Sequence, residues 1–111
     1  MSILVDLNGT IASEGKPIQK TIDYLQTVTE DIYVISGSTE EKRHQYERLL
    51  KKFNINYVSL ILNPIDQDKD IEFKIHNAQQ VPNITLAIDN NPKIIQAYID
   101  LGINTIHPND I

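Results

Sequence analysis

The sequence has no cysteine and no tryptophan, and only 4 glycines and 5 prolines among its 111 residues. The missing cysteines exclude disulfides, thiolate metal sites and cysteine nucleophiles. No apolar run approaches the roughly 20 residues that a membrane-spanning helix needs. The first residues also lack the basic stretch and long apolar core of a signal peptide. We therefore expect a soluble, cytoplasmic protein with no membrane partner.

What the sequence does contain is ordinary for a globular protein, with 41% hydrophobic and 23% charged residues. This composition argues against disordered, collagen-like and coiled-coil chains. The length fits a single domain that covers residues 1–111. The formal net charge of -5 disfavours tight non-specific binding to nucleic acid, because that binding depends on a basic surface.

Apolar runs typical of buried parallel strands alternate with segments of helical periodicity. The expected strands are residues 3–5, 32–35, 57–62, 84–88 and 103–106, and the expected helices are residues 18–25, 39–52, 71–78 and 92–101. The polar segment 12–17 predicts a tight turn or a small hairpin. Five strands alternating with four helices indicate an α/β fold with an open sheet and right-handed crossovers.

Residues that favour helix ends bound these segments. Ser38 followed by Glu41 is a capping-box pattern. Asn91 and Pro92 predict an N-cap with proline in the first helical position, and Gly102 fits the end of that helix. Asp68 or Asp70 is expected near the start of the third helix. The expected buried faces of the helices consist of Ile18, Ile22, Leu25, Tyr46, Leu49, Leu50, Phe53, Ile71, Ile75, Ala78, Ile94, Tyr98 and Leu101.

Polar side chains follow three of the expected strands, at the edge where open α/β sheets bind ligands. These segments are Asp6-Leu7-Asn8-Gly9-Thr10, Ser36-Gly37-Ser38 and Asp89-Asn90-Asn91-Pro92. Lys74 lies in the helix before the fourth strand, and Lys69 precedes it by five residues. Each feature has an ordinary explanation when taken singly: a strand end, a helix cap, a turn or a solvated lysine.

Taken together, these residues predict a phosphate site. Asp6 is a suitable nucleophile for covalent phosphoryl transfer. Asp6 and Asp89, with a backbone carbonyl, offer the oxygen ligands that Mg²⁺ prefers. The helix start at Ser36 and Gly37 offers a hydroxyl and backbone amides to an anion. A lysine adds positive charge against the crowded anions.

These segments resemble the motifs of the haloacid dehalogenase (HAD) phosphatase superfamily. The run Ile3-Leu4-Val5-Asp6-Leu7-Asn8-Gly9-Thr10 is similar to the first motif, a strand ending in Asp-x-Asp-Gly-Thr. Val34 to Ser38 resembles the second motif, and Leu86 to Pro92 resembles the fourth. Lys74 is the best match for the lysine of the third motif, with Lys69 in reserve. The resemblance implies a capless, three-layer Rossmann-like sandwich whose five parallel strands have the order 5-4-1-2-3.

The resemblance also implies roles for the site residues. Asp6 would attack phosphorus and form an aspartyl-phosphate, and Lys74 would orient it. The phosphate would be bound by Thr10, Ser36, Gly37 and Lys74, with Thr10 bracing the loop. Mg²⁺ would be held by Asp6, the backbone carbonyl of Asn8, and Asp89 or Asn90. The expected activity is Mg²⁺-dependent phosphomonoester hydrolysis.

Asn8 departs from the family pattern. The family's phosphatases have an aspartic acid here, which protonates the leaving group and later activates water. An amide cannot exchange protons, and general acid–base catalysis is commonly worth about 10²–10⁴-fold. Three explanations stay open: a slow natural enzyme, a phosphate-binding or regulatory module without turnover, or a chain inactivated on purpose. A receiver domain is disfavoured, because its phosphorylated aspartate follows the third strand.

The short segments between the expected strands leave no room for a cap domain over the site. In this superfamily, an open site often takes a phosphorylated macromolecule, such as a nucleic-acid end or a phosphoprotein. The segment 86–105 also looks like that of small phosphatases linked to nucleic-acid end repair. Oligomerisation is the other way in which such a site could be covered.

Overall fold

A computed structural model describes residues 1–64 and 69–111 of the chain. The strands are β1 (Ser2–Asp6), β2 (Ala12–Ser13), β3 (Lys16–Pro17), β4 (Asp31–Ser36), β5 (Ser59–Leu62), β6 (Ile84–Ile88) and β7 (Thr105–Ile106). The helices are α1 (Gln19–Leu25), α2 (Arg43–Lys52), α3 (Asp70–Ala78) and α4 (Pro92–Asp100), with short 3-10 helices η1 (Glu40–Lys42) and η3 (Pro108–Asp110). None of the helices in these two ranges is long and apolar enough to cross a membrane.

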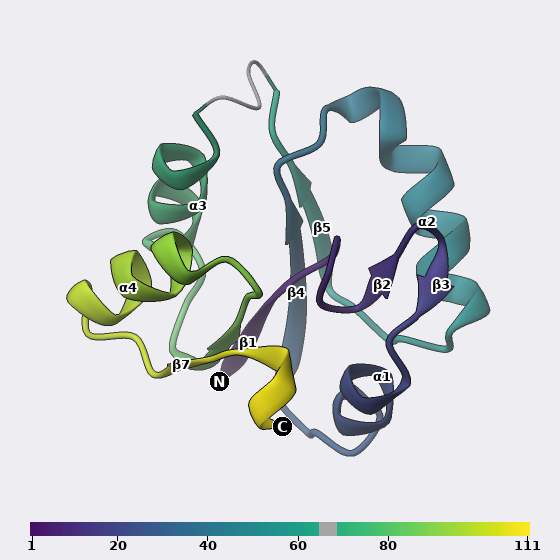
Figure 1. Ribbon diagram of the computed structural model, residues 1–111, viewed down its shortest axis with the longest axis horizontal. Coiled ribbons are helices and arrows are strands. Elements are labelled where there is room, and N and C mark those ends of the chain that lie inside the picture. The colour runs from purple at the N-terminus through teal and green to yellow at the C-terminus, as the bar shows by residue number, and fades with distance from the viewer. Residues whose placement is uncertain (65–68) are drawn as a thin grey trace.

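Five parallel strands form the sheet, in the order β5-β4-β1-β6-β7. The α/β class and the five-stranded parallel sheet are therefore confirmed. The strand labels differ from the predicted 5-4-1-2-3 because β2 and β3 form a separate antiparallel ribbon and take two of the numbers. In Figure 1, α1 and α2 lie on one side of the sheet, while α3 and α4 lie on the other.

Strand β1 occupies the centre of the sheet, and its five residues are all buried. Its side chains alternate between the two faces, as the two-residue period of a strand requires. Ile3 and Val5 belong to the cluster that contains residues of α1 and α2. Leu4 belongs to the cluster formed with α3 and α4. Because both faces are covered, an unbroken apolar run is the expected sequence for this strand.

The polar segment after β1 forms the small hairpin β2–β3, which the sequence predicted as a turn or hairpin. Ala12 pairs with Pro17 and Ser13 with Lys16. The two residues between the strands, Glu14 and Gly15, have φ values of 52° and 77°. Two residues with positive φ are what a tight hairpin turn needs to match the strand twist.

The predicted helix start at Ser38 is wrong. The segment 39–52 divides into η1 and α2, and Ser38 caps neither of them. The N-cap position of η1 is Thr39, and its side chain makes no capping hydrogen bond. Ser38 instead lies within hydrogen-bonding distance of Tyr46, with 2.8 Å between the two hydroxyl oxygens. A tertiary contact therefore replaces the local cap.

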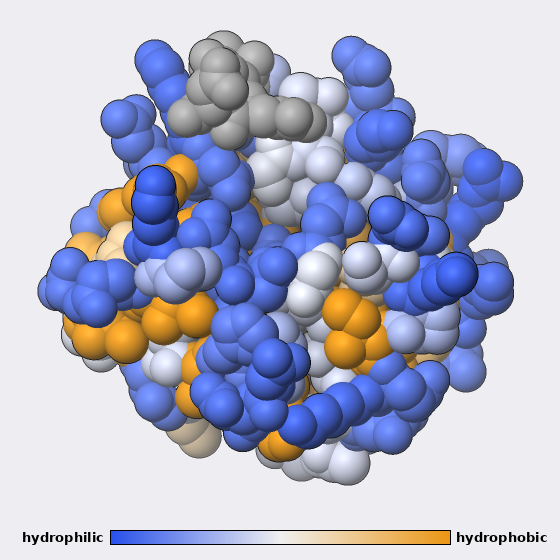
Figure 2. Space-filling model, viewed as in Figure 1, coloured by the Kyte–Doolittle hydropathy of each residue, from blue (hydrophilic) through white to orange (hydrophobic). Residues whose placement is uncertain are grey.

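Two predicted buried positions lie on the surface. Ile71 in α3 is 36% exposed and Leu101 after α4 is 40% exposed. The buried residues of α3 are Lys74 and Ala78. The helix is therefore rotated so that a lysine, rather than Ile71, faces the sheet. Figure 2 shows several hydrophobic patches on a face that is otherwise mostly hydrophilic. Asp70 begins α3, and Asp68 lies outside the described residues.

Replacing a core leucine tests the assignment of this buried cluster. Leu50 of α2 is completely buried among the side chains that cover one sheet face. We expect Leu50→Ala to lower the free energy of unfolding by about 2–5 kcal/mol, because it leaves a cavity. Leu101→Ala is the matched control and should cost less than about 1 kcal/mol, because Leu101 is largely exposed. Urea denaturation followed by circular dichroism measures both; equal losses would contradict the assigned core.

Candidate active site

The carboxyl ends of three adjacent strands bring polar residues to one edge of the sheet. Asp6 is the last residue of β1, and Ser36 is the last residue of β4. Asp89 directly follows β6. These strands are neighbours in the sheet, with β1 between the other two. The three residues are almost fully buried, with at most 4% of the surface of each exposed.

Lys74 joins two of these strand ends. It comes from the buried face of α3, and only 3% of its surface is exposed. Its Nζ lies 2.8 Å from Oδ1 of Asp6 and 2.8 Å from Oδ2 of Asp89. Lys69, the reserve candidate, stands at the N-cap position of α3 and is exposed. The structure thus brings Lys74, and not Lys69, to Asp6.

Burial and charge oppose each other in this group. Burial raises the pKa of Asp6 to about 7, Asp89 adds to the rise, and Lys74 opposes it. Burial acts to lower the pKa of Lys74, but Asp6 and Asp89 outweigh this and raise the pKa above its ordinary value. Lys74 therefore stays charged at neutral pH, while Asp6 in the ligand-free protein titrates near neutrality.

The loop after β1 provides a hydrogen bond that orients the carboxyl of Asp6. The Thr10 hydroxyl donates to Oδ2 of Asp6 at 3.1 Å. Thr10 is completely buried and is not among the residues that line the pocket, so its hydroxyl braces the nucleophile candidate from within the loop. Gly9 has a φ of 81°, and a Cβ at this position would collide with the side chain of Asn90. The turn therefore requires glycine for both its conformation and its close packing.

Asn8 belongs to a cluster of hydroxyl groups that the sequence did not reveal. Its Nδ2 lies 3.2 Å from Oγ of Ser36, 3.4 Å from Oγ of Ser38 and 3.2 Å from the hydroxyl oxygen of Tyr46. Ser36 Oγ also accepts the backbone N–H of Ser38 at 3.2 Å. With two donors aimed at its oxygen, the Ser36 hydroxyl can direct its own hydrogen to an anion. Tyr46 was predicted only as a core residue.

The residues after β6 combine site and helix cap. Asp89 Oδ1 accepts the backbone N–H of Asn91 at 2.9 Å. Asn91 in turn accepts the backbone N–H of Lys93 at 2.9 Å, which confirms it as the N-cap of α4. Asp89 is therefore held by Lys74 on one oxygen and by the backbone on the other. A carboxylate fixed in this way keeps its orientation without a ligand.

These residues surround a pocket of about 480 Å³ at the carboxyl edge of the sheet. Its lining consists of Asp6, Asn8, Ser36, Gly37, Ser38, Asp70, Lys74, Asp89, Asn90 and Asn91. Every predicted site residue except Thr10 is in this set. Asp70 was not predicted as a site residue. Its position four residues before Lys74, on the same helix face, is the signal that could have found it.

The pocket offers oxygen ligands to a metal ion rather than a preformed cage. Among the residues of the two described ranges, no group of three or more His, Cys, Asp and Glu side chains is placed to hold a metal ion by itself. Mg²⁺ does not need such a group, because it is usually held by one or two carboxylates, with water or phosphate oxygens completing its coordination. Asp6 and Asp89 are the carboxylates in reach. No backbone amide of the described residues donates to the carbonyl of Asn8.

Comparison with known proteins establishes the fold. No protein-family model and no curated protein matches the sequence. The structure is similar to that of a chain in the Pnkp1/Rnl/Hen1 RNA repair complex, with a TM-score of 0.83 and 16% sequence identity. The match covers 96% of this chain and 41% of that chain. The fold is thus shared with a part of a larger protein.

The pH dependence of stability tests the environment of Asp6. A buried carboxyl whose pKa rises from 3.8 to about 7 keeps its proton in the folded state across that range, so its contribution to stability falls as pH rises. The asparagine of Asp6→Asn does not titrate, so its contribution to stability does not fall as pH rises. In the presence of a chelator, the stability of Asp6→Asn relative to the unmodified protein should therefore increase between pH 4 and pH 7.

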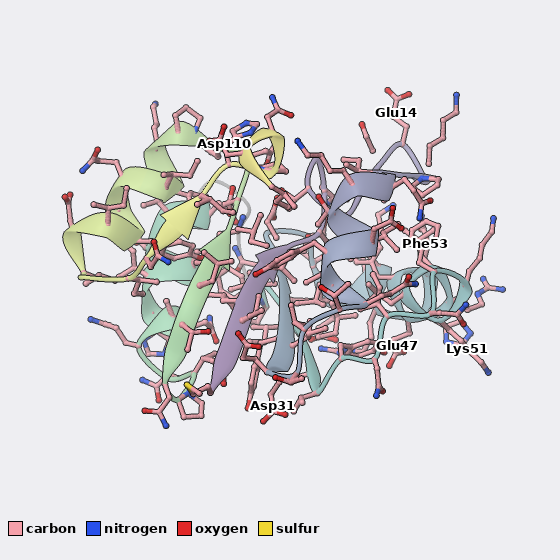
Figure 3. All side chains as sticks on the ribbon, turned by 90° about the horizontal axis from the view of Figure 1, so that it is seen from below. Glu14, Asp31, Glu47, Lys51, Phe53 and Asp110 are labelled. Carbon is pink, nitrogen blue, oxygen red and sulfur yellow. The ribbon has the colours of Figure 1, made fainter. Side chains whose placement is uncertain are left out.

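Thermal unfolding at several pH values measures this difference. Asp31→Asn is the control, because Asp31 is exposed at the first residue of β4, at the opposite end of the strands (Figure 3). A relative stability of Asp6→Asn that does not change with pH would contradict the raised pKa.

Proposed function

We propose that this chain is a Mg²⁺-dependent phosphomonoester hydrolase of the HAD type, with Asp6 as its nucleophile. The observation that carries the proposal is the position of Lys74, whose Nζ lies 2.8 Å from both Asp6 and Asp89. A buried lysine with two carboxylates, beside an open pocket, is a costly arrangement for structure alone. Perturbed groups that converge in a pocket favour a catalytic site.

The chain's own residues can each take a part in phosphoryl transfer. The carboxylate of Asp6 attacks phosphorus and forms an aspartyl-phosphate, from which water later releases phosphate. Lys74 holds one Asp6 oxygen at 2.8 Å and favours the ionised form of Asp6. The hydroxyl of Ser36 and the backbone at Gly37 face the pocket, where they can bind phosphoryl oxygens.

The charges of the pocket support the use of a divalent cation. Three carboxylates, those of Asp6, Asp70 and Asp89, face one ammonium, that of Lys74. When all four groups are ionised, two negative charges remain unbalanced, and a phosphate dianion would add to them. Mg²⁺ would be held by Asp6, the carbonyl of Asn8, and Asp89 or Asn90. It would supply the positive charge that lets nucleophile and phosphate approach.

The substrate class follows from the shape of the site. Among the described residues no separate domain covers the pocket, and the only insertion between β1 and α1 is the short ribbon β2–β3. An open site of this kind suits a phosphate group on a macromolecule. The similarity to a chain of an RNA repair complex favours a nucleic-acid end over a phosphoprotein. The net charge of -5 implies that binding relies on the phosphate itself rather than on the wider surface.

A binding module without turnover is the alternative function, and the contacts of Asn8 favour it. The Nδ2 of Asn8, which carries two N–H donors, lies within 3.2–3.4 Å of the hydroxyl oxygens of Ser36, Ser38 and Tyr46. A group in this position cannot take a proton from water. Under this alternative the pocket binds Mg²⁺ and phosphate, and nothing is released.

Replacing the nucleophile tests the enzymatic proposal. The unmodified chain should cleave p-nitrophenyl phosphate slowly, only with Mg²⁺, and acid quench with mass spectrometry should find phosphate on the peptide that contains Asp6. Asp6→Asn should reduce the rate to that of the buffer, because an amide cannot act as the nucleophile. Asp31→Asn should keep full activity. Turnover retained by Asp6→Asn would refute the proposed mechanism.

Replacing Asn8 separates the two candidate functions. A binding module predicts no turnover by the unmodified chain, phosphate binding in calorimetry, and Mg²⁺-dependent activity only in Asn8→Asp. A slow enzyme predicts turnover by both proteins, with the faster rate in Asn8→Asp. The gain should not exceed about 10²–10⁴-fold, the usual range of a general acid–base group. Loss of phosphate binding in Asn8→Asp would show that the amide itself is required.

A further inference from the structure

A hydrolase with asparagine at position 8 lacks its usual proton-transfer group. Cleavage of a phosphomonoester with a poor leaving group needs a proton donor, and hydrolysis of the phosphoenzyme needs a proton acceptor. The hydroxyls around Asn8 contact one another and the Asn8 amide rather than a base. The question is therefore whether another titratable side chain reaches the same pocket.

Asp70 reaches it from α3. It is the first residue of the helix and lies one turn before Lys74, so both side chains project from one face. Oδ2 of Asp70 lies 3.8 Å from Nζ of Lys74. The carboxyl also packs against Gly37 at the end of β4, where a Cβ would collide with Oδ1. Asp70 thus extends along the pocket wall from α3 to the loop expected to bind phosphoryl oxygens.

The contacts of Asp70 are not those of a structural ion pair. Lys74 already has carboxylate partners at 2.8 Å in Asp6 and Asp89, and 3.8 Å is too long for a third hydrogen bond. Oδ1 of Asp70 is buried and has no hydrogen-bond partner among the described residues. Nevertheless 30% of the side chain remains exposed, on the pocket side. Because one oxygen of Asp70 has no hydrogen-bond partner and the side chain is partly accessible, the carboxyl is free to exchange a proton with a ligand.

The electrostatic environment of Asp70 is suited to proton transfer. Burial raises the pKa of Asp70 above its ordinary value; Asp89 adds to this rise and Lys74 opposes it. A carboxyl that is more easily protonated than usual is a better acid near neutral pH. Phosphate bound beside it would add a further negative charge and act in the same direction.

We propose that Asp70 is the proton-transfer residue that replaces the missing aspartic acid at position 8. The proposal rests on the proposed hydrolase function. In the first step, Asp6 bonds to phosphorus, the bond to the leaving oxygen breaks, and that oxygen takes the proton of Asp70. In the second step, water attacks phosphorus, Asp70 accepts a proton from the water, and the bond to Asp6 breaks. Phosphate leaves, and Asp6 and Asp70 return to their initial forms.

Two substrates with different leaving groups test this role in Asp70→Asn. The leaving group of p-nitrophenyl phosphate, p-nitrophenolate, is stable without a proton. The leaving group of glycerol 2-phosphate is the alkoxide of glycerol, which must be protonated as it leaves. We expect Asp70→Asn to cleave glycerol 2-phosphate about 10²–10⁴-fold more slowly. With p-nitrophenyl phosphate, it should release one rapid equivalent of nitrophenolate and then stall as the phosphoenzyme, because the second step lacks its base. Glu72→Gln is the matched control, an exposed acid in the same helical turn that does not line the pocket.

A second variant and a folding control complete the experiment. Adding Asn8→Asp to Asp70→Asn should restore cleavage of glycerol 2-phosphate, because it returns a carboxyl to the pocket. Thermal unfolding shows that each variant is folded, and Asp70→Ser serves in the same assays if Asp70→Asn is not.

The outcomes separate the two proposals. If the unmodified chain is active and Asp70→Asn slows the first step, release of the leaving group, equally for both substrates, leaves turnover of both unchanged or accelerates both, the role of Asp70 is refuted while the hydrolase stands. Acceleration would mean that the carboxylate only repels phosphate. If the unmodified chain cleaves neither substrate with Mg²⁺, the proposed function fails and the role of Asp70 fails with it.

Discussion

The ammonium group of Lys74 is the constraint on which the site depends. Two carboxylates that are almost fully buried cannot remain ionised side by side unless a cation compensates them. Lys74 provides it, at 2.8 Å from each. Removing one partner of a buried charge group typically costs about 3–5 kcal/mol, because the others are left uncompensated. The charge that the proposed chemistry would use is the same charge that compensates the buried carboxylates, so the site and the sheet edge are stable only together.

Much of the fold could be predicted from the sequence, because the strands of a parallel sheet have a clear signal. β1, β4 and β6 lie in a sheet with helices on both faces, and most of their residues are apolar. Once strands and helices alternate, the carboxyl ends must lie at one edge, and Asp6, Ser36 and Asp89 are brought together without any knowledge of their contacts. Asn91 and Pro92 were recognisable because their cap is a local interaction.

What could not be predicted depends on contacts between distant segments. Ser38 has the sequence of a helix cap, but the hydroxyl of Tyr46 and the amide of Asn8 engage it instead. A pattern of apolar residues cannot show that α3 turns Lys74 inward and leaves Ile71 exposed. The orientation depends on ion pairs between Lys74 and carboxylates at the ends of other strands. The position of Asp70 against Gly37 depends on that same rotation. In each case a polar tertiary interaction overrides a local preference.

The separation of 68 residues between Asp6 and Lys74 has a consequence for how the protein is made. The ribosome produces Asp6 before β4 and β5, and its counter-charge on Lys74 only after them. Until Lys74 has been made, the carboxyl of Asp6 on the central strand lacks the cation that compensates its burial. Contacts between such distant positions form late and slow folding. Domains fold as units once their sequence is available. The growing chain therefore has no complete pocket until the residues of α3 and the segment after β6 have been made.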